Sequence, residues 1–156
     1  MADRIVTTID ELKELAGQEL GAGSWFEVTQ ERVNQFADAC GDHQWIHVDP
    51  ARAKNGPFGG TIAHGYLTLA LSFTLQESRA GVKVEIPSKL GVNYGLNRVR
   101  FPAPVHVGKR IRARTKLLSL DEVSANIYQI VNEVTVEIEG EAKPGMVAES
   151  VVRMYL

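Results

Sequence analysis

The chain has 156 residues, of which 44% are hydrophobic and 23% charged, and 17 basic against 19 acidic side chains leave a net charge of −2. These values are typical of one globular domain over residues 1–156 and exclude a disordered, collagen-like or coiled-coil chain. Near-neutral charge gives no electrostatic reason to expect nucleic acid or a membrane surface as a partner. The single cysteine, Cys40, excludes an internal disulfide, and the start of the chain lacks the apolar core of a signal peptide, so we expect a cytoplasmic protein.

The N-terminal part of the chain predicts one short helix and one strand. Thr8 and Glu11 have the spacing of a capping box, which opens a helix that extends to about Ala16 and ends at Gly17. Residues 24–28 have the composition of a short strand.

Two more helices and two loops are predicted next. A threonine-capped helix covers residues 30–40, with Gly41 as its C′ residue, and a loop follows it. Asp49 and Pro50 then start another helix, as N-cap and first helical residue. The glycine-rich residues 55–60 are predicted to form a mobile loop.

The segment from His64 to about Arg79 is the most apolar part of the chain, with no charged residue before Glu77. Its apolar side chains point in nearly every direction around a helix axis, so we expect a helix that is buried on all sides. The segment is too short to span a bilayer. Burial on all sides then requires a sheet that curls around the helix, or a partner subunit that covers its second side.

From Lys89 onward the hydrophobic pattern has a period of two, which is typical of half-exposed strands. The alternation is clear over residues 90–99, 110–117, 128–138 and 148–156. Because helices come first and strands second, we expect an α+β fold with an antiparallel sheet of about five strands around the buried helix.

The densest cluster of polar side chains is the loop over residues 41–48, which holds Asp42 and His47. Asp42 follows a helix C-terminus, where the backbone dipole is already negative, and a protonated His47 would relieve this repulsion. We therefore expect Asp42 to raise the pKa of His47 and the pair to suit general acid–base chemistry. The structural alternative is that Asp42 caps a turn and that His47 is a half-buried loop residue.

Gly65 lies at the N-terminus of the predicted apolar helix. Backbone N–H groups at this place have no intrahelical acceptor, and a glycine lets a ligand oxygen approach closely, so the amide suits stabilisation of a developing oxyanion. The alternative interpretation is a tight entry into the helix.

Residues 41–49 (GDHQWIHVD) resemble the hydratase motif G-D-x-N-P-[IL]-H-x-D of the MaoC-like, (R)-specific enoyl-CoA hydratases. In that family a His-Gly pair opens a long helix about twenty residues later, as His64 and Gly65 do here. The form of the motif, together with residues 88–101 (SKLGVNYGLNRVRF), is most similar to the NodN-like branch, which includes (3R)-hydroxyacyl-thioester dehydratases. The resemblance is close over about residues 36–107.

The resemblance implies a single hot-dog fold, a curled antiparallel sheet around one long central helix, in a homodimer with the acyl chain near the subunit interface. It implies that Asp42 and His47 are the catalytic pair and that the Gly65 amide binds the thioester carbonyl. Gln44 stands where the family usually has asparagine and would orient His47 or the water through its amide. Trp45 stands where the family usually has proline, and its packing would stiffen the loop.

The activity implied is hydration of trans-2-enoyl thioesters to (3R)-hydroxyacyl thioesters, and the reverse dehydration, without a cofactor or metal. The substrate is carried by CoA or an acyl-carrier protein, whose phosphates the basic side chains of residues 110–116 would bind unless these are the solvated side of the sheet. His43 and His106 are assigned surface or structural roles. Two alternatives stay open, an acyl-CoA thioesterase and a non-catalytic acyl-thioester-binding NodN-like protein.

Overall fold

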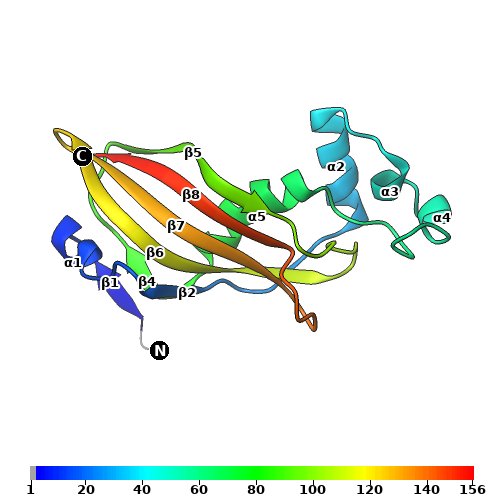
Figure 1. The fold of residues 1–156 in the computed structure, drawn as a ribbon, viewed down its shortest axis with the longest axis horizontal. Helices are drawn as coiled ribbons and strands as arrows, with labels where there is room; N and C mark the ends of the chain where they lie inside the picture. Colours follow the sequence, from blue (N-terminus) through cyan, green and yellow to red (C-terminus); the bar gives the residue numbers. More distant parts are fainter. Residues whose placement is uncertain (1–2) are drawn as a thin grey trace.

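The computed structural model describes residues 3–156, and its main feature is a sheet of eight strands. The strands follow the order β1-β4-β2-β6-β7-β8-β5, and β3 pairs with β6 outside this path. Figure 1 shows β6, β7 and β8 running side by side, with β5 along the edge of β8. The bounds are β1 Arg4–Val6, β2 Glu19–Ala22, β3 Phe26–Glu27, β4 Ala80–Val84, β5 Leu90–Arg100, β6 Arg110–Ser124, β7 Ile127–Ile138 and β8 Met146–Tyr155.

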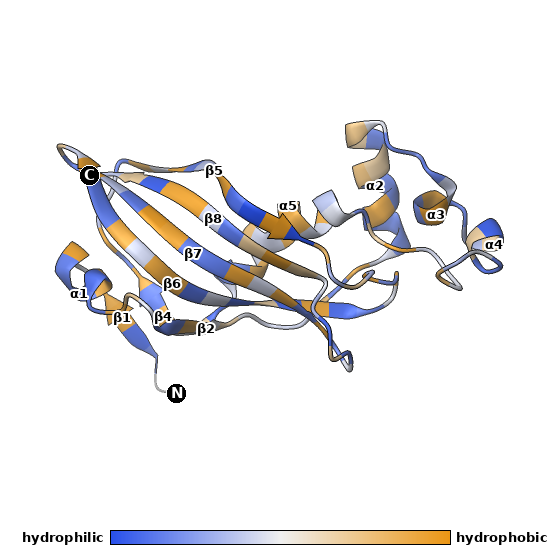
Figure 2. Ribbon diagram, in the orientation of Figure 1, coloured by the Kyte–Doolittle hydropathy of each residue, from blue (hydrophilic) through white to orange (hydrophobic). Residues whose placement is uncertain are grey.

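The long strands confirm the alternation that the sequence predicts. In β6 the side chains of Ile111, Ala113 and Leu117 are fully buried, and the basic side chains between them lie on the opposite face. Asn126, with φ of 59°, forms with Ala125 the two-residue turn that joins β6 to β7. Figure 2 shows the same alternation as bands of opposite hydropathy along β6, β7 and β8.

The sequence does not predict β1, β2 and β4, which extend the sheet beyond β6. β1 pairs in parallel with β4, so the sheet is mixed and has eight strands where about five antiparallel strands are expected. These strands have only three to five residues, too few for an alternation to stand out. The pairing of β2 with β4 also needs a glycine, because a Cβ on Gly21 would lie 1.9 Å from the Ala80 carbonyl oxygen.

Five helices complete the described residues: α1 Ile9–Lys13, α2 Gln30–Cys40, α3 Trp45–Val48, α4 Pro50–Ala53 and α5 Gly65–Glu77. The predicted capping box is present, since the Thr8 hydroxyl accepts the Glu11 N–H and the Glu11 carboxylate accepts the Thr8 N–H. α1 ends at Lys13, earlier than expected, and continues as turns. No helix within residues 3–156 is long and apolar enough to cross a membrane.

α5, with 13 residues, corresponds to the expected central helix and lies against one face of the sheet (Figure 1). Leu67, Leu71 and Leu75 are buried in the main core, among side chains from β6, β7 and β8. The other side of the helix is open in this chain, because Tyr66 and Phe73 are 72% and 62% exposed. The chain alone therefore buries one side of a helix that the sequence predicts to be covered all round. α2, α3 and α4 group beyond the N-terminal end of α5 (Figure 1).

Candidate active site

The candidate site begins where α2 ends. Gly41 has left-handed backbone geometry, with φ of 80°, and its N–H donates to the Ala37 carbonyl oxygen at 2.8 Å. This glycine cap turns the chain out of α2 and makes Asp42 the first residue of the connection. The Asp42 carboxylate accepts the backbone N–H of Gln44 at 3.3 Å. The segment expected as a loop contains the one-turn helix α3, which carries His47.

His47 is buried, with 7% of its surface exposed. Its Nδ1 lies 2.7 Å from the Ile62 carbonyl oxygen and donates a hydrogen bond to it, because a carbonyl can only accept. Nε2 therefore holds a free lone pair whenever the ring is neutral, which is the state that a general base needs.

Gln30, at the start of α2, holds the backbone around His47. Its Nε2 donates to the His47 carbonyl oxygen at 2.7 Å, and its Oε1 accepts the Thr61 hydroxyl at 2.6 Å. The Ile62 N–H also donates to the Ile46 carbonyl oxygen at 3.0 Å. Two segments on either side of the glycine-rich loop are thus tied together, and the ring of His47 has a defined orientation.

Burial lowers the pKa of His47 below its ordinary value, and the neighbouring His64 lowers it further. The hydrogen bond to Ile62 and the charge of Asp42 act in the opposite direction but do not prevail. The expectation that His47 has a raised pKa is therefore wrong, because the loss of hydration on burial outweighs the attraction of the carboxylate. His47 is neutral at pH 7 and ready to accept a proton.

His64 is the site residue that the sequence analysis misses, since it enters there only as the neighbour of Gly65. Its ring stacks on His47, with centroids 3.8 Å apart and planes inclined by 24°. Its Nε2 donates to the Asp42 carbonyl oxygen at 2.9 Å, and its buried Nδ1 has no hydrogen-bond partner within the described residues. The signal available in the sequence is a histidine at the start of an otherwise apolar helix.

One carboxylate oxygen of Asp42 and one ring nitrogen each of His47 and His64 lie within 4.8 Å of one another. Two polar atoms this far apart can share one water, because each hydrogen bond spans about 2.8 Å. The same donor types could hold a metal, but the lone pairs of two stacked imidazoles lie in two nearly parallel ring planes, which do not meet at a point close to both rings. The arrangement therefore suits a water bridge better than a shared metal ion.

Gly65 is the first residue of α5 and directly follows His64, one of the two stacked histidines, in the sequence. As the first helical residue it has a backbone N–H without an intrahelical acceptor, at the positive end of the helix dipole. A Cβ at this position would lie 2.9–3.1 Å from ring atoms of Phe101. The glycine thus lets the aromatic ring approach the helix end, and the site has a bare N–H beside its acid–base groups.

The role that the resemblance implies for the Gln44 amide, orienting His47 or the water, stays a prediction. The side chain of Gln44 is exposed, caps no helix and has no hydrogen bond to His47 within residues 3–156, but its backbone carbonyl oxygen accepts the His47 N–H at 2.9 Å. Its backbone N–H, not its amide, reaches Asp42. Trp45 packs as expected: a Cβ on Gly56 would lie 2.8 Å from its ring, and the Arg52 guanidinium stacks 4.4 Å from the ring centroid.

Comparison with known proteins identifies the family. Residues 11–139 match the MaoC like domain. The chain belongs to the MaoC-like family. It is 53% identical over 150 residues to 3-hydroxyacyl-thioester dehydratase Z of Mycobacterium tuberculosis, covering 96% of this chain and 97% of that one. It is 45% identical over 142 residues to Nodulation protein N of Rhizobium meliloti, covering 90% and 87%.

The fold of the MaoC-like chain is also found among solved structures. An (R)-hydratase from A. caviae involved in PHA biosynthesis matches with a TM-score of 0.66 and 25% identity, over 88% of this chain and 94% of that one. The expected α+β hot-dog-like fold is thereby confirmed, and the predicted resemblance to the MaoC-like and NodN-like proteins is confirmed with it.

The basic side chains of β6 in this MaoC-like chain are engaged in ion pairs. Arg110 pairs with Glu139, and Arg112 with Glu137 at 2.6 Å. The guanidinium of Arg112 also lies 4.5 Å from the ring centroid of Trp25. These contacts favour the solvated-sheet interpretation over a binding site for the phosphates of a thioester carrier.

The two histidines assigned surface or structural roles make contacts outside the stacked pair. His43 is hydrogen-bonded to the Asp38 carboxylate at 2.8 Å, which raises the pKa of this exposed imidazole. His106 lies 2.9 Å from the Phe58 carbonyl oxygen and ties the glycine-rich loop to the start of β6. Each of these two histidines thus makes a hydrogen bond that fits a structural role.

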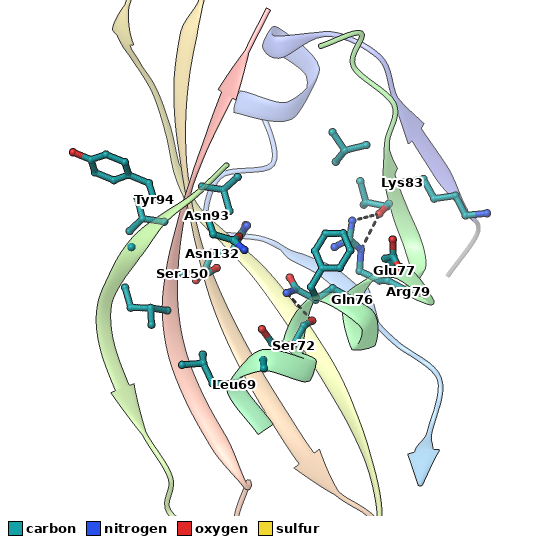
Figure 3. A pocket seen from close by; sticks show the side chains of 18 of the residues that line it. Leu69, Ser72, Gln76, Glu77, Arg79, Lys83, Asn93, Tyr94, Asn132 and Ser150 are labelled. Atoms are coloured by element: carbon teal, nitrogen blue, oxygen red, sulfur yellow. Dashed lines mark hydrogen bonds between the residues drawn. The ribbon is translucent and has the colours of Figure 1, made fainter. Parts of the chain in front are cut away.

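A cavity of about 760 Å³ lies between α5, β5 and β8 and reaches β4 at its far end. Leu69, Ser72 and Gln76 line it from α5, as Figure 3 shows. These residues follow Gly65 by four, seven and eleven positions, so they lie on the same face of the helix as Gly65. The cavity therefore begins about one turn beyond Gly65 and extends toward the C-terminal end of α5, and Asp42, His47 and Gly65 are not among its lining residues.

Proposed function

We propose that this site adds water to trans-2-enoyl thioesters, giving (3R)-hydroxyacyl thioesters, and catalyses the reverse dehydration. The observation that carries the proposal is the position of Asp42 and a neutral His47 beside the N-terminus of α5. The enzyme class predicted from the sequence, a hydro-lyase, is that of the 3-hydroxyacyl-thioester dehydratase to which the chain is 53% identical over nearly the whole length of both.

In the hydration, the Asp42 carboxylate and His47 Nε2 hold one water by its two hydrogens. As the water oxygen bonds to C3, His47 Nε2 takes one proton, and the electrons of the C2–C3 double bond move toward the thioester carbonyl. The lowered pKa of His47 keeps the ring neutral and able to take this proton. Such a positioned acid–base group contributes about 10²–10⁴ in rate.

The charge that develops on the thioester oxygen is stabilised at the helix end. The Gly65 N–H donates to this oxygen, and the α5 dipole adds a positive potential. The Phe101 ring against Gly65 excludes water from one side of the donor. In a dry site, one donor of this kind is worth roughly 10²–10³ in rate.

The imidazolium of His47 then returns its proton to C2, on the face from which the water came. The atoms balance, because one hydrogen of the water ends on C2 and the hydroxyl on C3, while His47 and Asp42 regain their initial states. His64 acts as a positioning residue. Its Nε2 donates to the backbone carbonyl oxygen of Asp42, and its ring stacks on the ring of His47.

The acyl chain of the substrate lies in the cavity along α5, and CoA or an acyl-carrier protein carries the thioester outside it. We further propose that a second copy of the chain covers the open side of α5 and the edge strand β5, as predicted. The exposed side chains of Tyr66 on α5, and of Leu90 and Val92 on β5, lie outside the cavity lining and form the surface that this copy buries. Thioester chemistry of this kind fits the predicted cytoplasmic location.

A direct assay tests the function. Purified protein is mixed with crotonyl-CoA, and we expect the absorbance of the conjugated enoyl group to fall as (3R)-hydroxybutyryl-CoA forms, which chiral chromatography identifies. A thiol-reactive dye in parallel reactions reports hydrolysis. Release of free CoA without hydration would favour the thioesterase alternative, and binding without any turnover would favour the non-catalytic one.

A further inference from the structure

Gln30 is a polar side chain beside the candidate site that takes no part in the proposed chemistry. It is the first residue of α2, directly after the N-cap Thr29, and it is half-buried. Its Nε2 donates to the His47 carbonyl oxygen at 2.7 Å and to Asn34 Oδ1 at 2.9 Å, and its Oε1 accepts the Thr61 hydroxyl at 2.6 Å. The His47 carbonyl can only accept, so it must face the nitrogen, and the orientation of the amide is fixed.

The two residues that Gln30 joins decide the direction of the catalytic ring. His47 carries the ring, and Thr61 directly precedes Ile62, whose carbonyl oxygen accepts the hydrogen bond from His47 Nδ1 at 2.7 Å. A shift of Thr61 and Ile62 relative to His47 would turn the ring or break this bond, and Nε2 would then point elsewhere. Gln30 therefore spans a distance on which the direction of His47 Nε2 depends.

Neither of the two segments is held strongly by its own secondary structure. The helix that carries His47, α3, has four residues, and a helix this short is not stable by itself. The last carbonyl oxygens of a helix have no intrahelical donor, and Gln30 supplies one to His47. Thr61 follows residues 55–60, three of which are glycines with many accessible backbone conformations. The amide of Gln30 thus supplies order that the local sequence does not.

We propose, as an extension of the proposed function, that Gln30 is a positioning residue for the hydration, whose amide sets the direction in which His47 Nε2 meets the water. Thr61 belongs to the same arrangement, because its hydroxyl holds the oxygen of the amide. Gln30 does not line the cavity along α5, so it acts on the reaction through His47 and not through the acyl chain. Displacing a catalytic group by about 1 Å can lower the rate roughly 10²-fold, so the contact affects kcat although no atom of Gln30 reacts.

Steady-state kinetics with crotonyl-CoA test this role. Gln30→Met keeps the length of the side chain but removes its hydrogen bonds, so we expect kcat to fall about tenfold while KM stays within about twofold of the wild type. Gln35→Met is the matched control, because it removes the hydrogen bond of an exposed glutamine on the same helix to Glu31 and should leave both constants unchanged. Thermal unfolding followed by circular dichroism checks that each variant is folded at the assay temperature.

Variants of Thr61 test whether the two side chains act together. Thr61→Val has nearly the same shape without the hydroxyl and should lower kcat about fivefold, whereas Thr61→Ser keeps the hydroxyl and should rescue most of the rate. The double variant Gln30→Met/Thr61→Val should be no slower than Gln30→Met, because the hydroxyl has already lost its partner in the single variant. Losses that multiply in the double variant would overturn the shared role of Thr61.

The hydrogen bond between His47 Nδ1 and Ile62 gives a readout that does not depend on catalysis. With ¹⁵N-labelled histidine, the Nδ1 proton is assigned by its loss in His47→Gln, and we expect it to exchange with water about tenfold faster in Gln30→Met than in the wild type or Gln35→Met. An unchanged exchange rate, an unchanged kcat, or a rise in KM in place of the fall in kcat would overturn the inference. A wild type that does not hydrate crotonyl-CoA would overturn the proposed function instead, and the exchange rates would still decide whether Gln30 holds the ring.

Discussion

The two ends of α5 differ in how the groups around them are held. At the N-terminal end, one ring nitrogen of His47 is hydrogen-bonded to the Ile62 carbonyl oxygen, and one of His64 to the Asp42 carbonyl oxygen. Farther along the helix, side chains from α5, β5, β7 and β8 line a cavity of about 760 Å³. The first region is fixed by main-chain contacts before any ligand arrives, while the shape of the second depends on side chains.

This difference separates chemistry from selectivity. The acid–base groups are held by main-chain contacts that do not depend on the rest of the substrate, so the same reaction can occur on different acyl chains. The cavity is formed by side chains from α5, β5, β7 and β8, which can vary without disturbing the stacked pair. The following variants test whether the two ends are as independent as this implies, from the largest expected effect to the smallest.

The largest effect is expected from the acid–base pair. Asp42→Asn or His47→Gln should lower the rate of crotonyl-CoA hydration by at least about 10²-fold, because each removes one of the groups that hold the water. The enoyl absorbance gives the rate, and far-ultraviolet circular dichroism checks the fold. Rates within a few fold of the wild type in either variant would rule out the proposed pair.

A smaller loss, about 10²-fold in kcat/KM, is expected for Gly65→Ala. The new methyl group would collide with the Phe101 ring, whose atoms lie 2.9–3.1 Å from the Cβ position, and would displace the carbonyl from its donor. The double variant Gly65→Ala/Phe101→Leu relieves the collision and should recover part of the activity. If the double variant were no better than the single one, the Phe101 contact would not be the cause.

His64→Leu should lower kcat for crotonyl-CoA by about tenfold, since Asp42 loses its hydrogen bond and His47 its stacked neighbour. Because His64 also lowers the pKa of His47, the acid limb of the kcat/KM profile, expected below pH 6.5 in the wild type, should move to higher pH. His64→Gln can still donate to Asp42 and should retain more activity. An acid limb that stays in place would argue against coupling between the two rings.

The open side of α5 can be tested without touching the cavity. Tyr66→Glu places a charge on the surface that a second copy is proposed to cover, and should weaken the dimer about tenfold or more because a buried unpaired carboxylate is costly. Analytical ultracentrifugation measures the dissociation constant, with exposed Asn34 on α2 changed to Glu as control. A wild type that sediments as a monomer at all concentrations would contradict the dimer.

The smallest effect is expected at the ion pairs of β6. Arg112→Gln removes the contacts with Glu137 and Trp25, and should lower the free energy of unfolding by about 1 kcal/mol. The KM for crotonyl-CoA should stay within twofold of the wild type. A KM raised tenfold for CoA substrates, but not for a short thioester without the nucleotide, would restore the phosphate-binding interpretation.

Much of the fold could be predicted because its signals are local. The capping box of Thr8 and Glu11 starts α1 within a few residues, and the alternation in β6 is visible over eight residues. The pairing of β1 with β4 joins Arg4 to Val82, and no local pattern announces a contact over that separation. The short strands, the parallel pairing and the mixed sheet therefore could not be predicted from the sequence and are seen only in the structure.

The site residues also divide into those that the local sequence predicts and those that depend on the three-dimensional fold. Asp42 and His47 are close in the sequence, and Gly65 is recognised from its place at a helix start. His64 lies 22 residues from Asp42, and their hydrogen bond depends on the course of the glycine-rich loop between them. The direction of the His47 pKa could not be predicted either, because it depends on burial, which the motif does not encode.

The central claim is that one acid–base pair delivers both parts of water to the same face of the double bond. Hydration of crotonyl-CoA in D₂O tests it most directly, since deuterium marks the hydrogen added at C2 and proton NMR coupling reports its orientation relative to the C3 hydroxyl. The account predicts one product, (3R)-hydroxybutyryl-CoA with deuterium and hydroxyl added syn. Anti addition, or a mixture of C2 epimers under conditions where product exchange is excluded, would contradict it.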